Sequence, residues 1–424
     1  MSRLKDGHWK EIHSARPGES PGAGGAIWKG ETAVMFTIRK FNQISDIIGK
    51  HLNQRHYEIS EDAQHYEGIL VRSADLLSAE FPPELVVIAR AGAGYNNIPV
   101  DRCTEQGIAV FNTPGANANA VKELVLCGLL LAGRRIIDAN RWLESLHEEH
   151  AEGIEKLVEK GKKQFVGPEL MGKTLGVVGL GAIGVMVANA AVQGLGMKVL
   201  GYDPYLSVDA AWHLSSEVGR VKSLEEIYTS CDYITLHLPL NDQTRGMIGE
   251  TAIQSMKPGT VLLNIARGGL VSEKALIAAL ESGHLRHYVT DFPDEGILGV
   301  KGVIATPHLG ASTPESEENC AEMAARQLRA FIEDGNIVNS VNLPRCEMPR
   351  TGGYRISVIN RNIKNMVGQI TAALAESGCN IEHMVNSSRG EWAYTMLDLT
   401  TAPDQACIDR ISAIDGVVRV RTLF

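Results

Sequence analysis

The chain has 424 residues, a formal net charge of −9 and 44% hydrophobic residues. This length predicts two or three domains, and the composition is that of an ordinary globular protein. The negative charge disfavours nucleic acid or an anionic membrane as the main partner, and no apolar run approaches the roughly 20 residues of a membrane span. Seven scattered cysteines without a C-x-x-C pair are typical of reduced thiols and predict no metal site. We therefore expect a cytoplasmic protein.

From about residue 35 to 343, short apolar runs alternate with helical stretches, which is typical of buried parallel sheets. In the first unit, strands are predicted at 69–71, 85–89 and 109–111. We assign residues 35–133 to this unit, and expect the returning segment 309–343 to complete it. Residues 1–34 show no helical or strand period and are expected to be a disordered extension.

A second α/β unit is predicted over residues 134–308. It begins with a charged helical segment, 136–163, and a long helix at 315–334 follows its end. Its strands are predicted around Val177, Val199, 233–236, 261–263 and 303–304. The first two units are thus predicted to be Rossmann-like and doubly wound.

The tail, residues 351–424, follows a proline-containing linker at 344–350 and has another rhythm. Its elements are predicted in the order strand, helix, strand, strand, helix, strand, at 355–359, 367–377, 381–387, 392–399, 405–414 and 417–423. This order predicts a small ferredoxin-like βαββαβ domain. The fold class is therefore α/β, with two Rossmann-like units and a ferredoxin-like tail.

A glycine motif marks a dinucleotide site in the second unit. Gly179-x-Gly181-x-x-Gly184 follows a strand-like run and opens a helix. The first glycine permits a tight turn, the second lets backbone approach a pyrophosphate, and the third lets the helix pack on the strand. Asp203 ends the next strand, 19 residues after Gly184. An acid at that place accepts hydrogen bonds from the adenosine ribose and repels a 2′-phosphate, which predicts NAD rather than NADP.

Three further side chains are expected at the same edge of the second sheet, because ligands of open α/β sheets lie outside the carboxyl ends of the strands. Arg267, Asp291 and His308 each follow a predicted strand. Hydride transfer to a nicotinamide needs a base for the alcohol proton, and histidine suits this near neutral pH. It also needs a cation over the oxygen and the carboxylate, for which the planar guanidinium is suited. A carboxylate beside the histidine would orient the ring.

These strings resemble the D-2-hydroxyacid dehydrogenases, and within that family the phosphoglycerate dehydrogenases, over residues 35–424. The resemblance rests on Gly179–Gly184, Asp203, His237-Leu-Pro-Leu, Asn264-Ile-Ala-Arg267-Gly-Gly, Glu295 and Pro307-His308-Leu-Gly-Ala-Ser-Thr. It implies Arg267 as the carboxylate and carbonyl binder, His308 as the acid/base and Glu295 as its partner. The motif and the resemblance together give the expected contacts to NAD. These are Gly179, Gly181, Ala182, Ile183, Gly184, Asp203, His237, Pro239, Thr244, Ala266 and Asp291. The resemblance places Asp291 at the nicotinamide carboxamide.

The chain departs from the family pattern between Asp291 and Glu295. Relatives have an Asp-Val-Phe-x-x-Glu string, whereas Asp291-Phe-Pro-Asp-Glu295 is one residue shorter. Glu295 is our choice for the partner of the histidine, and Asp294 is the neighbouring acid that could be mistaken for it.

The first unit is expected to hold the substrate. The resemblance implies contacts at Arg72, Ser73 and the glycine loop at Ala91 and Gly92, where backbone amides can meet a carboxylate. Lys122, in the first turn of the long helix, either binds a substrate phosphate or is a solvated charge. Arg134 is either a further phosphate contact or a structural or interfacial residue.

The tail resembles an ACT domain, which implies assembly or control by an amino acid. In relatives that sense serine the loop reads His-Glu-Asn-Arg-Pro-Gly, whereas this chain has Ile363-Lys-Asn365-Met-Val-Gly368. Because the histidine is missing, we favour a role in homo-oligomer formation, as a dimer or tetramer, over serine binding.

The resemblance implies NAD-dependent oxidation of 3-phosphoglycerate to 3-phosphohydroxypyruvate, the first step of serine biosynthesis. One alternative is another D-2-hydroxyacid dehydrogenase, such as a hydroxypyruvate or glyoxylate reductase. A second is a non-catalytic regulatory protein that senses NAD or an amino acid.

Overall fold

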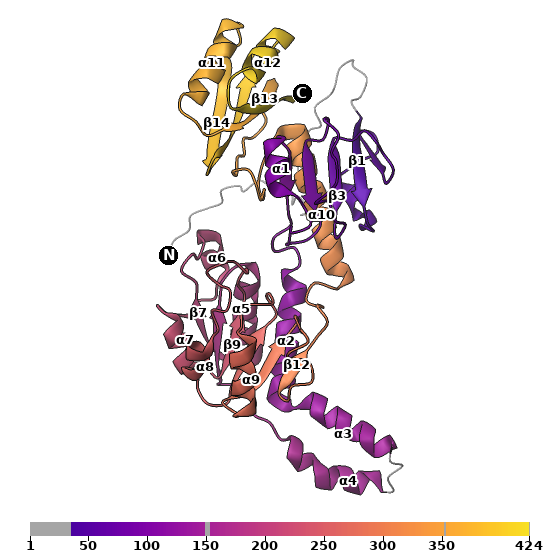
Figure 1. Cartoon of the computed structure of the whole chain (residues 1–424), viewed down its shortest axis with the longest axis vertical. Helices are drawn as coiled ribbons and strands as arrows, with labels where there is room; N and C mark the ends of the chain where they lie inside the picture. The colour runs from indigo at the N-terminus through magenta and orange to yellow at the C-terminus, as the bar shows by residue number, and fades with distance from the viewer. Residues whose placement is uncertain (1–34, 149–152, 352, 424) are drawn as a thin grey trace, which may run out of the picture.

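The computed structural model describes residues 35–148, 153–351 and 353–423. The expected extension at residues 1–34 lies outside this part of the chain. Three lobes follow one another along an elongated molecule (Figure 1). In the described residues no helix is both long and apolar enough to cross a membrane.

The first lobe is a five-stranded parallel sheet with the strand order β2-β1-β3-β4-β5. The strands are β1 (Phe36–Phe41), β2 (Tyr57–Ser60), β3 (Gly68–Val71), β4 (Val87–Arg90) and β5 (Ala109–Phe111). The short helices η1 (Asp46–Lys50) and α1 (Val100–Glu105) and the returning helix α10 (Pro314–Asp334) cover the sheet. The Rossmann-like α/β unit is therefore confirmed, and the returning helix α10 packs on its sheet.

The second lobe is a seven-stranded parallel sheet in the order β12-β11-β10-β9-β6-β7-β8. Its strands are β6 (Thr174–Val178), β7 (Lys198–Tyr202), β8 (Gly219–Arg220), β9 (Tyr233–Leu236), β10 (Thr260–Asn264), β11 (Leu285–Thr290) and β12 (Val303–Ala305). Its helices are α5 (Ala182–Leu195), α6 (Val208–His213), α7 (Leu224–Ser230), α8 (Glu250–Gln254) and α9 (Glu273–Glu281). The order reverses between β6 and β9, and ligands of such sheets bind outside the strand ends at this switch point.

Helix α2 (Ala118–Arg134) joins the first two lobes and packs on the second. Its buried residues Val121, Val125 and Leu129 belong to the core beneath β6 and β10. The sequence boundary at residue 133 therefore lies too late, because the apolar face of α2 is covered by the second sheet rather than the first.

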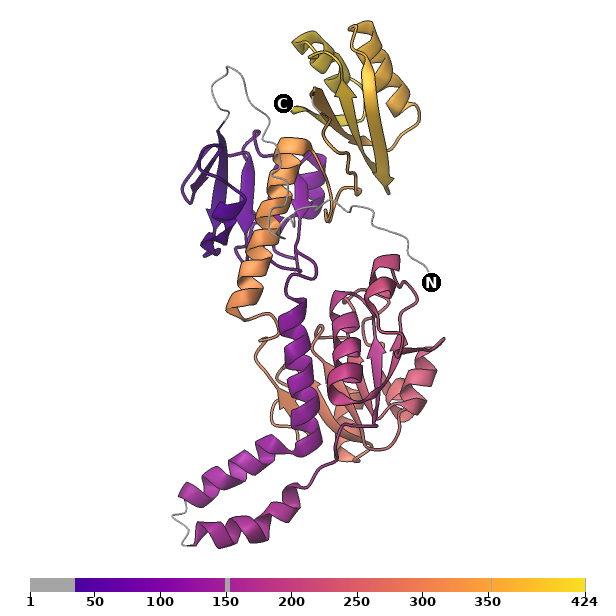
Figure 2. The same ribbon diagram turned by 180° about the vertical axis from the view of Figure 1, so that it is seen from behind.

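A helical arm leaves the second lobe after α2 (Figures 1 and 2). It consists of α3 (Ile136–Glu148), α4 (Ile154–Gly161) and the short η2 (Lys162–Phe165). Trp142 packs on Phe165 with ring centres 5.3 Å apart, which ties α3 to the returning segment.

The tail lobe is a four-stranded antiparallel sheet in the order β14-β15-β13-β16, with two helices on one face. Its elements are β13 (Tyr354–Arg361), α11 (Met366–Glu376), β14 (Ile381–Arg389), β15 (Trp392–Leu399), α12 (Gln405–Ser412) and β16 (Val417–Leu423). The βαββαβ topology predicted from the sequence is confirmed.

The other face of the tail sheet packs directly on the first lobe. Ile359, Tyr394 and Met396 belong to the same buried cluster as Phe331 and Ile332 of α10. Segment 344–350, predicted as a linker, is part of this contact, since Cys346 and Met348 are buried in it. The tail is therefore joined to the first lobe through a shared core.

A buried ion pair lies within this contact. The guanidinium of Arg355 binds both carboxylate oxygens of Asp398, at 2.6 and 2.9 Å. It also donates to the carbonyl oxygens of Asp334, Met348 and Pro349, each at 3.0 Å. The Arg355 side chain is 0% exposed and that of Asp398 3% exposed. The Arg355 side chain thus links the tail sheet to the end of α10 and to the connecting segment 344–350.

We expect Asp398→Ala to lower the free energy of unfolding by about 3–5 kcal/mol, because it leaves a buried guanidinium without its counter-charge. Glu391→Ala is the matched control, since the Arg361–Glu391 pair in the same sheet is exposed and such pairs contribute about 0–1 kcal/mol. Urea unfolding of the two variants checks this, and equal losses would contradict it.

Candidate functional site

The glycine motif forms the turn between β6 and α5, and each glycine has its own steric reason. Gly179 has φ +92°, and a Cβ there would lie 2.5 Å from the carbonyl oxygen of His237. A Cβ on Gly184 would collide with the carbonyl oxygen of Gly179. At Gly181 a Cβ would meet nothing within 4 Å. The turn is therefore closed on the protein side and open on the side where a ligand would approach.

The N-terminus of α5 faces this open side. Gly181 is its N-cap, and no side chain caps the helix. The first-turn amides, those of Ala182, Ile183 and Gly184, have no partner within the helix. Together with the helix dipole they form a site for a pyrophosphate. The residues present thus fit the phosphate part of a dinucleotide.

Asp203 follows β7 beside the same turn. One carboxylate oxygen accepts the amide of Leu180 and the other that of Tyr205, both at 2.8 Å. These bonds fix the carboxylate next to the glycine turn. A carboxylate has about four acceptor positions, so acceptor capacity remains for two ribose hydroxyls. The place of Asp203 agrees with its predicted role toward NAD.

His237 follows β9 and lies against Gly179. Its Nε2 is 3.1 Å from the hydroxyl of Thr235, whereas Nδ1 is buried without a partner. Burial lowers the pKa of the ring to about 4, so the imidazole is neutral near pH 7. Farther along this loop, Thr244 donates to the carbonyl oxygen of Pro239 at 2.6 Å. A neutral ring beside the glycine turn suits contact with an uncharged part of a ligand.

The three predicted chemical groups follow three neighbouring strands, β10, β11 and β12. Asp291 is 1% exposed. Its carboxylate accepts the amides of Leu309 and Gly310, both at 2.7 Å, and the hydroxyl of Thr306 at 2.6 Å. The loop that carries His308 is therefore folded around this carboxylate. Asp291, implied at the nicotinamide carboxamide, already makes three bonds to its own chain.

His308 is exposed and has φ +57°, in the left-handed region. Such a conformation is uncommon for residues other than glycine and persists where the surroundings hold it. Here the bonds of Asp291 on both sides of His308 supply that restraint. Arg267 is also exposed; its loop is held by Asn264, whose amide donates to the Arg267 carbonyl oxygen at 2.8 Å.

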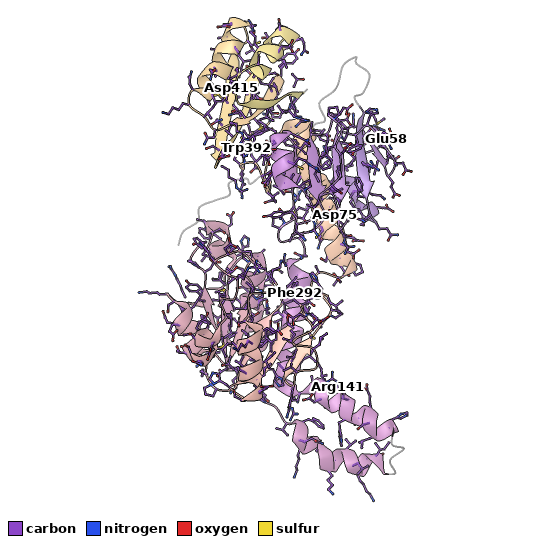
Figure 3. All side chains as sticks on the ribbon, viewed as in Figure 1. Glu58, Asp75, Arg141, Phe292, Trp392 and Asp415 are labelled. Atoms are coloured by element: carbon purple, nitrogen blue, oxygen red, sulfur yellow. The ribbon has the colours of Figure 1, made fainter. Side chains whose placement is uncertain are left out.

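Glu295 and His308 are not paired in this structure. No hydrogen bond or ion pair between them is found in the described part of the chain, and Glu295 is exposed. Instead, the ring of Phe292 packs on the imidazole with centres 4.6 Å apart. Phe292 lies on the side of the second lobe that is nearer the first (Figure 3). The predicted Glu295–His308 pair remains a prediction.

The first lobe contributes its own edge residues. Arg72 follows β3 and forms an ion pair of 2.7 Å with Glu317 in the first turn of α10. The amide of Ser73 donates to Asn42 at 3.0 Å. Beside them, the loop after β4 runs through Ala91 and Gly92, and Gly92 has φ +156°. The positions predicted for the substrate in this loop and at Arg72 therefore lie on neighbouring strands.

Arg90, the last residue of β4, is a candidate that the sequence reasoning did not single out. Its guanidinium lies over Gly92, and its Nε is buried without a partner. Burial lowers the pKa of Arg90, and the charges of Arg267 and Arg72 lower it further. Arg90 of the first lobe thus lies within electrostatic range of Arg267 of the second lobe and of Arg72. The signal in the sequence was an arginine at the end of a strand, directly before the glycine loop.

The two remaining predicted cations lie at opposite ends of α2. Lys122 donates to Asn119 at 2.6 Å, lies 3.7 Å from Glu123 and has a side chain that is only 19% exposed, so its two predicted roles remain predictions. Arg134 follows 12 residues later, which is about 18 Å along a helix that rises 1.5 Å per residue. Within one chain, Arg134 is therefore not part of the site that Lys122 borders.

The comparisons with known proteins agree with this geometry. Residues 129–310 match the family model "D-isomer specific 2-hydroxyacid dehydrogenase, NAD binding domain". The D-3-phosphoglycerate dehydrogenase of Methanocaldococcus jannaschii is 35% identical over 351 residues, which are 81% of this chain and 63% of that protein. The chain thus spans less than two thirds of that relative's length.

Solved structures show the same architecture. The NAD⁺-bound 3-phosphoglycerate dehydrogenase of Entamoeba histolytica is similar with a TM-score of 0.56 and 29% identity, covering 73% of this chain and 99% of that one. A glyoxylate reductase of Paecilomyes thermophila is similar with a TM-score of 0.58 and 27% identity, covering 73% and 99%. Residues 129–310 therefore match the NAD-binding domain of the D-isomer specific 2-hydroxyacid dehydrogenases.

Proposed function

We propose that this chain is an NAD-dependent dehydrogenase that oxidises 3-phosphoglycerate to 3-phosphohydroxypyruvate. The observation that carries the proposal is the convergence of Arg72, Arg90 and Arg267, with lowered Arg90 pKa, between the cofactor lobe and the first lobe. Only Arg72 of the three has an ion-pair partner in the described residues. A substrate with both a phosphate and a carboxylate matches this excess of positive charge.

The residues divide the chemistry between the two lobes. Arg267 binds the carboxylate and the C2 oxygen of the substrate, and His308 takes the hydroxyl proton of C2. Bound NAD⁺ supplies the acceptor for the hydride that leaves C2. Arg72 and Arg90 hold the phosphate, while the amides after Arg90 border the same space. Asp203 holds the ribose and disfavours a 2′-phosphate.

A glyoxylate or hydroxypyruvate reductase is the second candidate, and the similarity to a glyoxylate reductase supports it. Both candidates use His308 and Arg267 in the same way. They differ in the need for Arg72 and Arg90, because glyoxylate carries no phosphate. A non-catalytic regulatory protein would not need the side chains of His308 and Arg267, which disfavours that alternative.

We expect His308→Ala to lower kcat by about 10²–10⁴, the usual contribution of a positioned acid/base, with NADH binding unchanged. Glu295→Gln should change the pH dependence of kcat, whereas Asp294→Asn should not, which separates the two neighbouring acids. Steady-state kinetics and NADH titration check this. Near-normal turnover of the His308 variant would remove the histidine from the mechanism.

We expect Arg90→Gln and Arg72→Gln each to raise KM for 3-phosphoglycerate roughly ten- to hundredfold, because each removes a charge-assisted contact of about 1.5–3 kcal/mol. KM for unphosphorylated D-glycerate should change little. Arg55→Gln is the matched control, since Arg55 is exposed in the same lobe. If the wild type prefers the unphosphorylated acid, 3-phosphoglycerate is the wrong substrate and the reductase candidate is favoured.

We further propose that the chain forms a homodimer through the helical arm. Ile136, Leu143, Ile154 and Leu157 of the arm are 37–47% exposed, and α4 buries none of its residues. A helix of eight residues is marginal in water without a packing partner. Figure 3 shows the arm, with Arg141 labelled on α3, extending away from the rest of the lobe.

A second copy is the partner that the exposed apolar residues favour. Helix α3 carries Asp138, Arg141 and Glu144, and α4 carries two acids and two lysines, so the charges of the arm are mixed. A two-fold axis would bring the exposed apolar residues of the two arms together in one symmetric contact. The tail sheet, which the sequence favoured for assembly, has β14 and β16 as its edge strands. The proposal includes no amino-acid effector, because Ile363 is aliphatic and 47% exposed at the position of the expected histidine.

We expect Leu157→Asp to halve the mass measured in solution by light scattering, because it places a charge in the apolar face of the arm. Met384→Asp, an equally exposed change on β14, should leave the mass unchanged. The reverse result would place the assembly contact on the edge of the tail sheet.

A further inference from the structure

A polar cavity lies in the NAD-binding lobe, at the edge of the sheet opposite the glycine turn. It has a volume of about 290 Å³. Its walls come from the amino ends of β6, β9, β10 and β11 and from the returning segment at Pro168. The proposed active site uses the carboxyl ends of the same strands. The cavity is therefore separate from the cofactor and substrate positions.

The cavity carries an excess of positive charge. Its charged residues are Lys173, Asp232, Lys257 and Arg286. Lys257 binds one oxygen of Asp232 at 2.7 Å, and the amide of Thr174 binds the other at 2.9 Å. The single carboxylate is thus already satisfied. In the part of the chain that the structure describes, Lys173 and Arg286 have no acidic partner, although the protein as a whole carries a net charge of −9.

The guanidinium of Arg286 is held in place by Tyr233, but not all of its N–H donors have an acceptor. Its Nη2 donates to the hydroxyl of Tyr233 at 2.9 Å, and its carbon lies 5.7 Å from the centre of that ring. Tyr233 is 1% exposed, so this support is rigid. Nε is buried without a partner. Two cations without counter-charge beside one neutralised pair leave the cavity ready to accept a dianion.

The rim and the size of the cavity limit the ligand. A Cβ on Gly259, with φ +81°, would meet nothing within 4 Å, so the rim is open there. Sites for drug-sized ligands and cofactors enclose about 300–1,000 Å³, and this cavity lies at the lower limit. We propose that it binds a small phosphate dianion, free or as the phosphoryl group of a small monoester, through Lys173, Lys257 and Arg286. The proposal does not depend on the reaction assigned to the other edge of the sheet.

The test is isothermal titration of the full chain with inorganic phosphate. Saturating NADH occupies the pyrophosphate position, and an Arg72→Gln, Arg90→Gln background removes both phosphate contacts of the proposed substrate site. We expect one phosphate per chain under these conditions. Arg286→Gln should weaken its binding roughly ten- to hundredfold, the range for one charge-assisted hydrogen bond. Lys173→Gln should do the same, and it leaves the Arg286–Tyr233 contact intact if the first variant does not fold.

Arg220→Gln is the matched control, because Arg220 is exposed on β8 at the far side of the sheet, and it should bind phosphate as the background does. Repeating the titration with glycerol 2-phosphate identifies the source of the ligand. Tighter binding of the monoester indicates an organic phosphate, and tighter binding of inorganic phosphate indicates the free ion. Absence of binding in the background protein, or binding that neither cavity variant weakens, would overturn the proposal.

Discussion

The buried carboxylate of Asp291 is the group around which the reactive edge of the second lobe is folded. A buried charge is costly unless hydrogen bonds satisfy it, and here two amides and one hydroxyl do so. All three donors belong to the segment on either side of His308. The same residue's amide donates to the carbonyl oxygen of Asn264 at 3.3 Å, and Asn264 in turn holds the loop of Arg267. His308 and Arg267, to which we assign proton transfer and oxygen binding in the proposed function, are thus placed by one continuous set of bonds.

The second constraint is electrostatic and involves both lobes. Arg72 and Arg90 come from the first sheet and Arg267 from the second, and the charges of Arg267 and Arg72 add to burial in lowering the pKa of Arg90. Like charges that are partly withdrawn from water repel one another. An anionic substrate, bound as we propose, would relieve this repulsion.

Much of the fold follows from local sequence pattern. The bounds predicted for β5, β15 and β16 agree with the structure, since alternating or continuous apolar runs flanked by turns are strong signals. The steric role of each glycine in the motif was also predictable, because a tight turn, the approach of a ligand and the packing of helix on strand each exclude a side chain.

The errors concern tertiary contacts, which the local sequence pattern does not reveal. The boundary at residue 133 failed because periodicity identifies the apolar face of α2 without saying which sheet covers it. Arg134 was grouped with Lys122 by charge, although the length of one helix separates them. Arg90 was missed because a single arginine is normally assigned to the protein surface, and the sequence does not show that this one is buried.

The tail was predicted as a separate domain from the order of its helices and strands, yet it shares a buried core with the first lobe. Arg355 and Arg421 would be assigned to the surface from the sequence, yet Arg355 is fully buried and Arg421 donates to the carbonyl oxygens of Phe331 and Ile332 at 3.1 and 3.0 Å. Both acceptors lie near the C-terminal end of α10. The first turn of the same helix carries Glu317, the ion-pair partner of Arg72. A helix of 21 residues, about 30 Å long at 1.5 Å per residue, therefore runs from the tail to a residue of the proposed substrate site.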